Sequence, residues 1–470
     1  MQRPIGRGTR GFPSVGLGGG HRKIPRFLLP PRFFLARALI WPILASVKRS
    51  REQLLTIGIT AGVSALLTVF IRNFISGEKK ITHRITQHYG ISDPQFERAM
   101  SQLLGPPIVE GNRVTPLQNG AEIFPAMLDA IASAERSITF ETFIYWSGSI
   151  ADRFADALAA KARRGVKVHV LIDAFGCNCV NGEALRRMVQ AGVELELYHM
   201  TSLARTNHRT HRKLLIVDGK TGFTGGVGIA DNWDGNADDP KHFRDTQYRV
   251  EGPVVAQMQA AFLDNWMKTR AVVLHGEDYF PSLEEVGTLH CQMFKSSPME
   301  GSESARLMYL LSIAAAEKSI KIGNAYFLPD DLTTRTLVEA VGRGVSVEVL
   351  LPGRTIDSQT VRLASRQRMG RLLRGGVRVF EYEPTMYHCK CMMIDGHWTS
   401  VGSANFDNRS FRINDEANLN VISPDFTGEE MRVFDQDIAR SVEFTLDDWH
   451  GRSSGEKILG RTAALLRSQL

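Results

Sequence analysis

Cysteine is scarce in this chain, and its few cysteines lack the usual ligand spacing. The 470 residues include five cysteines, which excludes a small scaffold held together by disulfides. They fall into two C-x-C pairs, Cys177/Cys179 and Cys389/Cys391, with Cys291 alone, and neither pair has the C-x-x-C spacing of zinc or thioredoxin-like sites. We therefore predict buried structural cysteines. With 43% hydrophobic and 23% charged residues, the composition is that of a globular protein.

Surplus positive charge is missing from most of the chain. Residues 1–53 carry eleven Lys and Arg against one acid, whereas the other 417 residues hold 46 basic and 49 acidic side chains. The net charge of +7 therefore comes from a basic leader that is also rich in Gly and Pro. A body without surplus base disfavours a general nucleic-acid-binding surface, although a local basic cleft stays open. We expect the leader to face anionic lipid.

Residues 54–71 contain no charged side chain. As a helix this segment spans ~27 Å, near the lower limit for crossing a bilayer. Three interpretations are open: a transmembrane or signal-anchor helix, a cleaved signal or organelle-targeting segment, and a buried or interfacial helix. The length of the run and the lack of a clean small-x-small cleavage site favour the first. The basic flank predicts a cytoplasmic N-terminus, and a hairpin with the apolar run at residues 33–47 would reverse that orientation.

The chain beyond this segment contains an internal repeat. The pattern from Glu135 through Gly165 recurs from Glu317 through Gly344, at offsets of 182 and 179 residues. In both copies, helical segments alternate with strands rich in Val, Ile and Leu, which indicates a buried, largely parallel sheet covered by helices. We predict an α/β fold of two halves related by a pseudo-twofold axis, with mostly parallel sheets flanked by helices and an N-terminal membrane helix in front.

The predicted organisation has six segments. These are a basic leader (1–53), the predicted membrane-spanning helix (54–71), a linker or helical cap (72–119), the first half (120–285), the second half (286–450) and a C-terminal tail (451–470).

Each half carries one short polar pattern beside an apolar strand. The first is His211-x-Lys213-x4-Asp218 followed by Gly225-Gly226-Val-Gly228, and the second is His388-x-Lys390-x4-Asp395 followed by Gly402-Ser403-Ala-Asn405. Because residues i and i+2 of a strand share a face, each His points the same way as its Lys, and Cys389 and Cys391 point the other way. Two matching patterns in a duplicated unit predict one functional site between the halves.

This double pattern resembles the phospholipase D superfamily, in which two H-x-K-D motifs meet at one active site across a twofold axis. The resemblance covers roughly residues 120–450, and the extension at residues 406–416 is similar to the cardiolipin synthase branch of bacterial membrane enzymes. The first motif departs from the family pattern, with Gly226 where Ser is common and Gly228 where Asn is common. The resemblance implies six catalytic residues: His211, Lys213, Asp218, His388, Lys390 and Asp395.

The residue types suit attack on a phosphodiester. Lys213 and Lys390 can neutralise the phosphate oxygens. One imidazole can attack phosphorus to give a phosphohistidine while the other exchanges protons with the alcohols, so neither a metal nor a cofactor is expected. The family pattern implies His211 as nucleophile and His388 as acid/base, and the pseudo-symmetry leaves the reverse assignment open.

Four further residues are predicted to support the site. Asp245 and Glu416 each stand eight residues before a proline in the repeat, and we expect them to orient the histidines, with a surface salt bridge as the alternative. Ser403 and Asn405 support the second motif, Asn405 as a donor to a phosphate oxygen. Asp218 and Asp395, at the strand ends, are expected to organise the motif backbone and lysines.

Four functions follow from the resemblance and the leader. The first is transfer of a phosphatidyl group from phosphatidylglycerol to a second phospholipid, making cardiolipin. The second is hydrolysis to phosphatidic acid, the third a phosphodiesterase or nuclease, and the fourth a membrane protein with a relic site. The near-neutral body disfavours the nuclease and the intact motifs disfavour the relic. We expect phospholipid substrates, no nucleic acid, and location in a bacterial inner membrane.

Overall fold

The computed structural model describes residues 51–74, 83, 85–86, 89–177, 182–198, 207–297 and 304–465. Most of the predicted leader, the apolar run at residues 33–47, Cys179 and residues 466–470 lie outside these ranges. The chain divides into two units, Met1–Leu67 and Thr68–Leu470.

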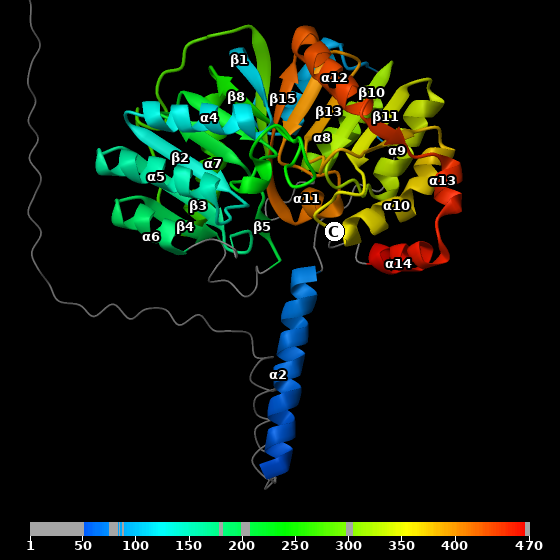
Figure 1. Ribbon diagram of the computed structural model, residues 1–470, viewed down its shortest axis with the longest axis horizontal. Coiled ribbons are helices and arrows are strands. Elements are labelled where there is room, and N and C mark those ends of the chain that lie inside the picture. Colours follow the sequence, from blue (N-terminus) through cyan, green and yellow to red (C-terminus); the bar gives the residue numbers. More distant parts are fainter. Residues whose placement is uncertain are drawn as a thin grey trace, which may run out of the picture. The chain divides into compact units, whose positions relative to one another are not determined.

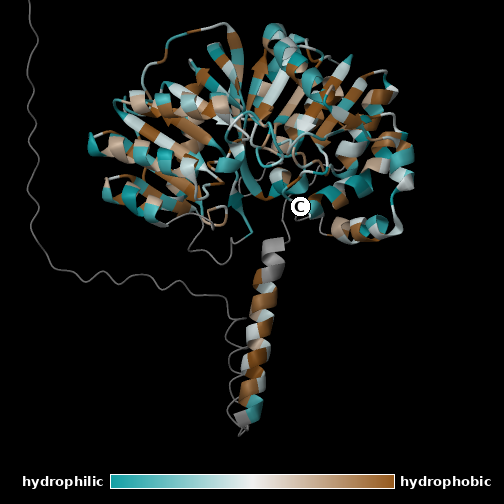
Figure 2. Ribbon diagram, viewed as in Figure 1, coloured by the Kyte–Doolittle hydropathy of each residue, from teal (hydrophilic) through white to brown (hydrophobic). Residues whose placement is uncertain are grey.

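The N-terminal apolar segment forms the helix α2 (Arg51–Phe74). Within the described ranges it is the one helix long and apolar enough to cross a membrane, over Glu52–Val69. Hydrophobic residues occur along its whole length (Figure 2), and side chains such as Leu55 and Leu66 are exposed. The helix thus contains the whole of the predicted span at residues 54–71.

The first half alternates strands with helices, as the repeat predicts, after the short helix α3 (Pro94–Leu103). Its elements in chain order are β1 (Val109–Gln118), α4 (Asn119–Ser133), β2 (Ser137–Thr142), α5 (Ser149–Arg163), β3 (Lys167–Asp173), α6 (Gly182–Gln190), β4 (Glu194–Tyr198), β5 (Arg209–Thr210), β6 (Leu214–Val217), β7 (Thr221–Gly225), the 3-10 helix η2 (Asp231–Trp233), β8 (Thr246–Glu251) and α7 (Val255–Arg270).

The second half repeats this order and adds a C-terminal extension (Figure 1). Its elements are β9 (Leu289–Ser296), α8 (Ser304–Ala315), β10 (Ser319–Asn324), α9 (Asp331–Gly342), β11 (Ser346–Pro352), α10 (Gln359–Arg374), β12 (Arg378–Tyr382), β13 (Lys390–Ile394), β14 (Trp398–Gly402), α11 (Asn408–Arg412), β15 (Asn414–Ile422), α12 (Pro424–Ile438), β16 (Ser441–Glu443), α13 (Leu446–Gly451) and α14 (Ser454–Leu465).

One continuous sheet runs through both halves, in the order β16-β12-β11-β10-β13-β14-β15-β9-β1-β8-β7-β6-β2-β3-β4. Read outward from the β9–β1 pair, the two sides have the same order of equivalent strands. Strand β1, in the segment predicted as a linker, is one of the two strands that join the halves, because it pairs antiparallel with both β8 and β9. The prediction of two repeated α/β halves flanked by helices is confirmed.

The prediction that the sheets are mostly parallel is wrong. Among the strands of the described ranges, the parallel neighbours are β2–β3–β4, β10–β11–β12 and the short β5–β15 pair, and the other neighbouring strands are antiparallel. The cause is the Asp-Gly pair that ends each motif strand. Asp218 and Gly219 have φ of 53° and 63°, and Asp395 and Gly396 have 54° and 63°. Such positive φ values build tight hairpins, so the motif strands β6 and β13 turn back antiparallel.

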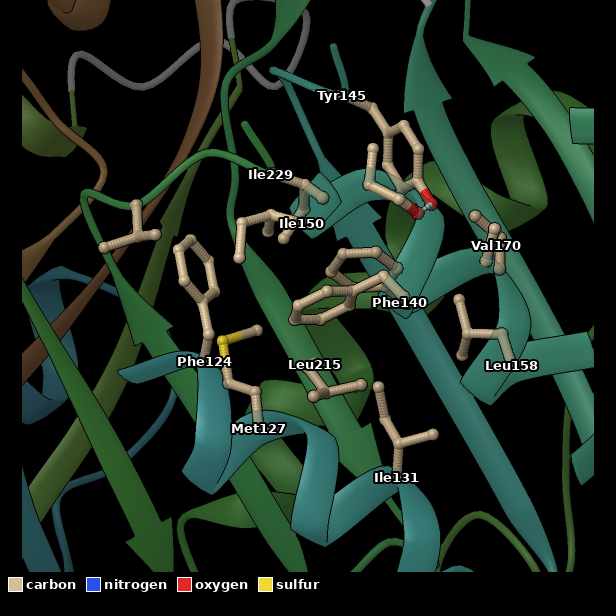
Figure 3. Packing of buried hydrophobic residues seen from close by; sticks show 14 of the residues in the cluster. Phe124, Met127, Ile131, Phe140, Tyr145, Ile150, Leu158, Val170, Leu215 and Ile229 are labelled. Carbon is tan, nitrogen blue, oxygen red and sulfur yellow. Dashed lines mark hydrogen bonds between the residues drawn. The ribbon is translucent and has the colours of Figure 1, made fainter. Parts of the chain in front are cut away.

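Helices cover both faces of the sheet, and the strands place alternate side chains into different cores. In the first half, Leu215 packs with α4 and α5 (Figure 3), whereas Leu214 and Ile216 pack with α7 on the other face. Met392 and Met393 of β13 separate in the same way between two clusters. This alternation determines which motif side chains share a face.

Candidate active site

Each motif histidine is attached through its backbone to the other half. Just before His211, β5 pairs with the start of β15, and the His211 N–H donates to the carbonyl of Asp415 at 2.9 Å. The His388 N–H donates to the carbonyl of Arg244 at 2.7 Å. His211 and Lys213 therefore lie just before β6, outside the ladder of their own half. This exchange of hydrogen bonds brings the two motifs to the interface between the halves.

The imidazoles pair with carboxylates across the same interface. His211 Nδ1 lies 3.0 Å from Glu416 Oε2, and His388 Nδ1 lies 2.7 Å from Asp245 Oδ2. Both carboxylates are buried and each histidine is 8% exposed, so the surface salt bridge considered for the carboxylates does not occur. Since each Nδ1–H donates to a carboxylate, Nε2 is the ring nitrogen left for chemistry.

The motif lysines lie on the same face as the histidines. Lys213 Nζ donates to the His211 carbonyl at 2.8 Å, and Lys390 Nζ donates to the His388 carbonyl at 2.7 Å. Lys390 Nζ also lies 3.1 Å from His388 Nδ1. In contrast, Arg212 contacts α7 on the opposite face, where it pairs with Asp264 at 3.0 Å. The shared face of His and Lys agrees with the period of two along the motif.

Burial and mutual repulsion shift the ionisation of these groups. Burial, together with the charge of Lys390, lowers the pKa of Lys213 to about 7, and burial lowers the pKa of Lys390 too. Burial also lowers the pKa of His211 to about 4 and that of His388 below its usual range. Burial therefore favours neutral imidazoles and destabilises the charged form of both lysines.

The two buried carboxylates stay ionised. Burial opposes their charge, but His211 and Lys213 outweigh it at Glu416, so its pKa is lowered. His388 and Lys390 do the same for Asp245. The two carboxylates hold the Nδ1 side of the imidazoles, and the two lysines lie on the same face as the histidines. This arrangement is suited to bind and polarise a phosphodiester.

The motif aspartates lie away from the histidines. Asp218 accepts hydrogen bonds from the backbone N–H groups of residues 135–137, at 2.7–2.9 Å, and Asp395 does the same for residues 317–319, at 2.7–2.8 Å. Each follows a motif strand, and the motif lysine lies at or just before the other end of that strand. They organise the start of β2 and β10, as the backbone role predicted, but the structure does not bring them to the lysines.

The supporting residues of the second motif lie beside Glu416. Ser403 Oγ donates to Glu416 Oε2 at 2.6 Å, and the Asn405 N–H donates to Ser410 Oγ at 3.0 Å. The side-chain oxygen of Asn405 is buried without a hydrogen-bond partner. The first motif offers no such groups, because Gly226 and Gly228 occupy the equivalent positions.

Sequence reasoning missed two donors to the carboxylates. Ser410 Oγ donates to Glu416 Oε1 at 2.7 Å, and Trp233 Nε1 donates to Asp245 Oδ2 at 2.9 Å. The signal was present but weak: each of these residues stands 22 positions after the histidine of its half.

Of the five cysteines, the structure describes all but Cys179. Cys177, Cys291 and Cys389 are buried, as predicted, whereas Cys391 is half-buried, and these four are free thiols. Cys389 faces away from the histidines, with its Sγ 3.6 Å from Thr246 Oγ1. Among the residues that the structure describes, no group of three or more His, Cys, Asp and Glu is arranged to hold a metal ion.

The chain is similar to proteins of known activity. A family model described as "Cardiolipin synthase, PLD-like domain" matches residues 127–266 and 309–438, one segment in each half. Cardiolipin synthase A of Pseudomonas syringae pv. syringae is 36% identical over 353 residues, which is 73% of each chain. Cardiolipin synthase A of Pseudomonas aeruginosa is 34% identical over 359 residues, covering 75% of this chain and 72% of that one.

The fold also occurs in a solved structure. Phosphatidylserine synthase of Haemophilus influenzae superposes with a TM-score of 0.64 at 12% identity, over 80% of this chain and 100% of that one. At this identity the likeness concerns the fold alone.

Proposed function

The chain belongs to the cardiolipin synthase family of phospholipase D-like proteins, and on this premise we propose that it is a membrane-anchored phosphatidyltransferase that makes cardiolipin from phosphatidylglycerol. One observation carries the proposal. His211 and His388 come from different halves, each held at Nδ1 by a buried carboxylate of the other half. Two oriented imidazoles beside two lysines meet the needs of a two-step phosphoryl transfer.

In the first step, the lone pair on His211 Nε2 attacks the phosphorus of phosphatidylglycerol. The bond from phosphorus to the headgroup oxygen breaks, and His388 gives its Nε2 proton to that oxygen, which releases glycerol and leaves a phosphatidyl group on His211. Bound phosphate favours the protonated form of His388, because a nearby anion raises the pKa of an imidazole. Glu416 stabilises the positive charge that develops on His211.

In the second step, the phosphatidyl group moves to an alcohol. A glycerol hydroxyl of a second phosphatidylglycerol gives its proton to His388 Nε2 as its oxygen bonds to phosphorus. The bond to His211 then breaks and its electron pair returns to Nε2, which gives cardiolipin and the starting protein. Water in place of this hydroxyl would give phosphatidic acid, so the choice of acceptor separates the synthase from the hydrolase.

The remaining residues divide into substrate contacts and framework. We assign Lys213 and Lys390 to the non-bridging phosphate oxygens, and the Asn405 side chain to a further phosphate contact. Ser403 holds Glu416 in place. Asp218 and Asp395 are assigned to the framework rather than to the reaction, because their hydrogen bonds go to the backbone at the start of β2 and β10.

The membrane location is supported by α2. A helix of 24 residues, with its apolar window at Glu52–Val69, is long enough to span a bilayer and keep the site next to its lipids. We place it in a bacterial inner membrane, with the N-terminus on the cytoplasmic side.

Reconstitution of the full chain in phosphatidylglycerol vesicles tests the proposal. We expect cardiolipin and glycerol in equal amounts, and no turnover in His211→Ala or His388→Ala. Phosphatidic acid as the only lipid product would replace the synthase with a hydrolase. Neither product, with cleavage of DNA instead, would overturn both lipid activities, and substantial turnover in either variant would contradict a shared two-histidine site.

A further inference from the structure

The two halves differ where the first motif ends in Gly226 and Gly228 instead of Ser and Asn. A Cβ atom on Gly226 would lie 2.4 Å from Asp245 Oδ1, and a Cβ atom on Gly228 would lie 2.7 Å from Ile144 Cβ and 3.0 Å from Trp233 Cζ3. All three distances are shorter than normal contacts. The space that Ser403 and Asn405 fill in the second half is therefore taken, in the first half, by the Asp245 carboxylate, the Ile144 side chain and the Trp233 indole.

In the second half, hydroxyl groups hold the orienting carboxylate. Ser403 Oγ donates to Glu416 Oε2 at 2.6 Å and Ser410 Oγ donates to Oε1 at 2.7 Å. Each oxygen therefore has its own hydroxyl donor, and Oε2 remains the acceptor for His211.

In the first half, an indole takes the place of the hydroxyls. The repeat aligns Trp233 with Ser410, since each follows its motif histidine by 22 residues, and η2 begins where α11 begins in that register. Trp233 Nε1 donates to Asp245 Oδ2 at 2.9 Å, and the Thr246 N–H donates to Oδ1 at 2.9 Å. Asp245 is one methylene shorter than Glu416. The longer Trp233 side chain therefore brings its N–H to the Asp245 carboxylate, in the place that the serine hydroxyl takes at Glu416.

The indole also contacts the histidine itself. The Trp233 ring meets the His388 ring edge-on, with centroids 5.2 Å apart and planes at 83°, and Phe243 stacks on His388 at 6.1 Å and 29°. Trp233 is 3% exposed. One side chain therefore fixes both members of the His388–Asp245 pair, by a hydrogen bond and by packing.

We propose that Trp233 is the positioning residue for His388, and that its N–H has replaced the serine hydroxyls that position Glu416 and His211 in the other half. The role given to His388 here rests on the proposed function. The consequence is that the His388–Asp245 pair and the His211–Glu416 pair depend on different hydrogen-bond donors. Removal of the indole N–H disturbs His388 and leaves His211 in place, whereas loss of the Ser403 or Ser410 hydroxyl does the reverse.

Two variants remove this donor. Trp233→Phe removes the N–H and part of the ring. Replacement of Trp233 by benzothienylalanine, in which sulfur takes the place of the indole N–H, keeps the size and shape of the ring and removes only the donor. Trp449→Phe is the matched control, because Trp449 Nε1 donates to the Arg366 carbonyl at 2.8 Å where α13 packs on α10, outside the site.

Histidine titration followed by NMR on the full chain, labelled with ¹⁵N-histidine and assigned with His388→Gln and His211→Gln, needs no turnover. The groups that act on His388 are Asp245, Lys390 and Asp357. With one donor fewer, Asp245 is less neutralised, so we expect the His388 titration to move to higher pH in both Trp233 variants. The His211 titration should stay unchanged within experimental error, and Trp449→Phe should move neither titration.

Kinetics in phosphatidylglycerol micelles provide the second readout. A hydrogen bond to a buried charge corresponds to about a 10- to 100-fold change in rate, so kcat should fall by that factor with KM within about twofold. An unmoved His388 titration, an equal shift at His211, or the same kcat loss in Trp449→Phe would overturn the positioning role. A His388 shift in a chain that makes no cardiolipin would leave the positioning role standing and reject the proposed function.

Discussion

The charge of Glu416, rather than its shape, should determine how well His211 attacks phosphorus. Glu416→Gln tests this, because an amide keeps the shape of the side chain and can keep its three shorter hydrogen bonds. The carboxylate oxygen Oε2 takes hydrogen bonds from His211 at 3.0 Å and Ser403 at 2.6 Å, whereas Oε1 takes them from Ser410 at 2.7 Å and from Asn414 at 3.4 Å. A Gln carbonyl can occupy the Oε2 position, and its NH2 group can donate to the Ser410 hydroxyl, which reverses its direction.

The size of the expected loss of kcat follows from the hydrogen bonds that the amide keeps. The three shorter hydrogen bonds persist and the longer one from Asn414 is lost, but the bond from His211 no longer has a charged acceptor while His211 becomes positive. A charged hydrogen bond contributes about 1.5–3 kcal/mol, which corresponds to roughly a 10- to 150-fold loss of kcat. Cardiolipin formation in detergent micelles with phosphatidylglycerol gives kcat and KM, and thermal unfolding should shift little.

Asp395→Asn is the matched control in the same half. Asp395 accepts three backbone hydrogen bonds at the start of β10, so its loss should lower the free energy of unfolding by about 1–2 kcal/mol and leave kcat within about threefold. More than half of the wild-type kcat in Glu416→Gln, or an equal loss of kcat in Asp395→Asn, would refute the division between orienting and framework carboxylates.

Three further predictions concern Lys213 and the cysteines. Lys213→Met should abolish turnover yet raise the thermal midpoint, since replacing a buried cation with an apolar side chain should raise the free energy of unfolding by about 1–4 kcal/mol. Because the folded-state pKa of Lys213 is below its unfolded value, this gain in stability should be full below pH 7 and shrink toward pH 10.5, and an unchanged midpoint at pH 6 would contradict it. In wild type, kcat/KM should fall as pH rises through about 7, where Lys213 loses its proton, and Lys213→Arg should lose this alkaline limb; a limb that persists in the Arg variant would assign it to another group. Cys389→Ala and Cys391→Ala should keep kcat within about threefold, because these side chains face away from the histidines, and a larger loss with normal folding would place a thiol at the site.

The sequence predicted the repeated unit and the meeting of the motifs, but not the direction of most strands. Apolar residues on both faces of a strand indicate burial, and buried parallel and antiparallel strands share that pattern. The Asp218-Gly219 and Asp395-Gly396 pairs carried the missing information, since this dipeptide builds the tight turn of an antiparallel hairpin.

The pairing of histidines with carboxylates could not be predicted, because the repeat is symmetric. Asp245 and Glu416 occupy equivalent places, and each would serve the histidine of its own half as well as that of the other until the exchange of β5 and residues 244–245 is seen. Trp233 was missed because only its alignment with Ser410, and the space vacated at Gly226, show what its N–H replaces.

The central claim is the phosphatidyl group carried by His211, and trapping it is the most direct measurement. A phosphatidyl ester of p-nitrophenol has a leaving group that needs no acid, so His388→Ala should still release one equivalent of p-nitrophenol and then stall. Mass spectrometry of the stalled protein should find one phosphatidyl group, on His211, and none in His211→Ala. An adduct on His388 in His211→Ala, or steady release of p-nitrophenol from His388→Ala with no adduct, would contradict the proposed mechanism.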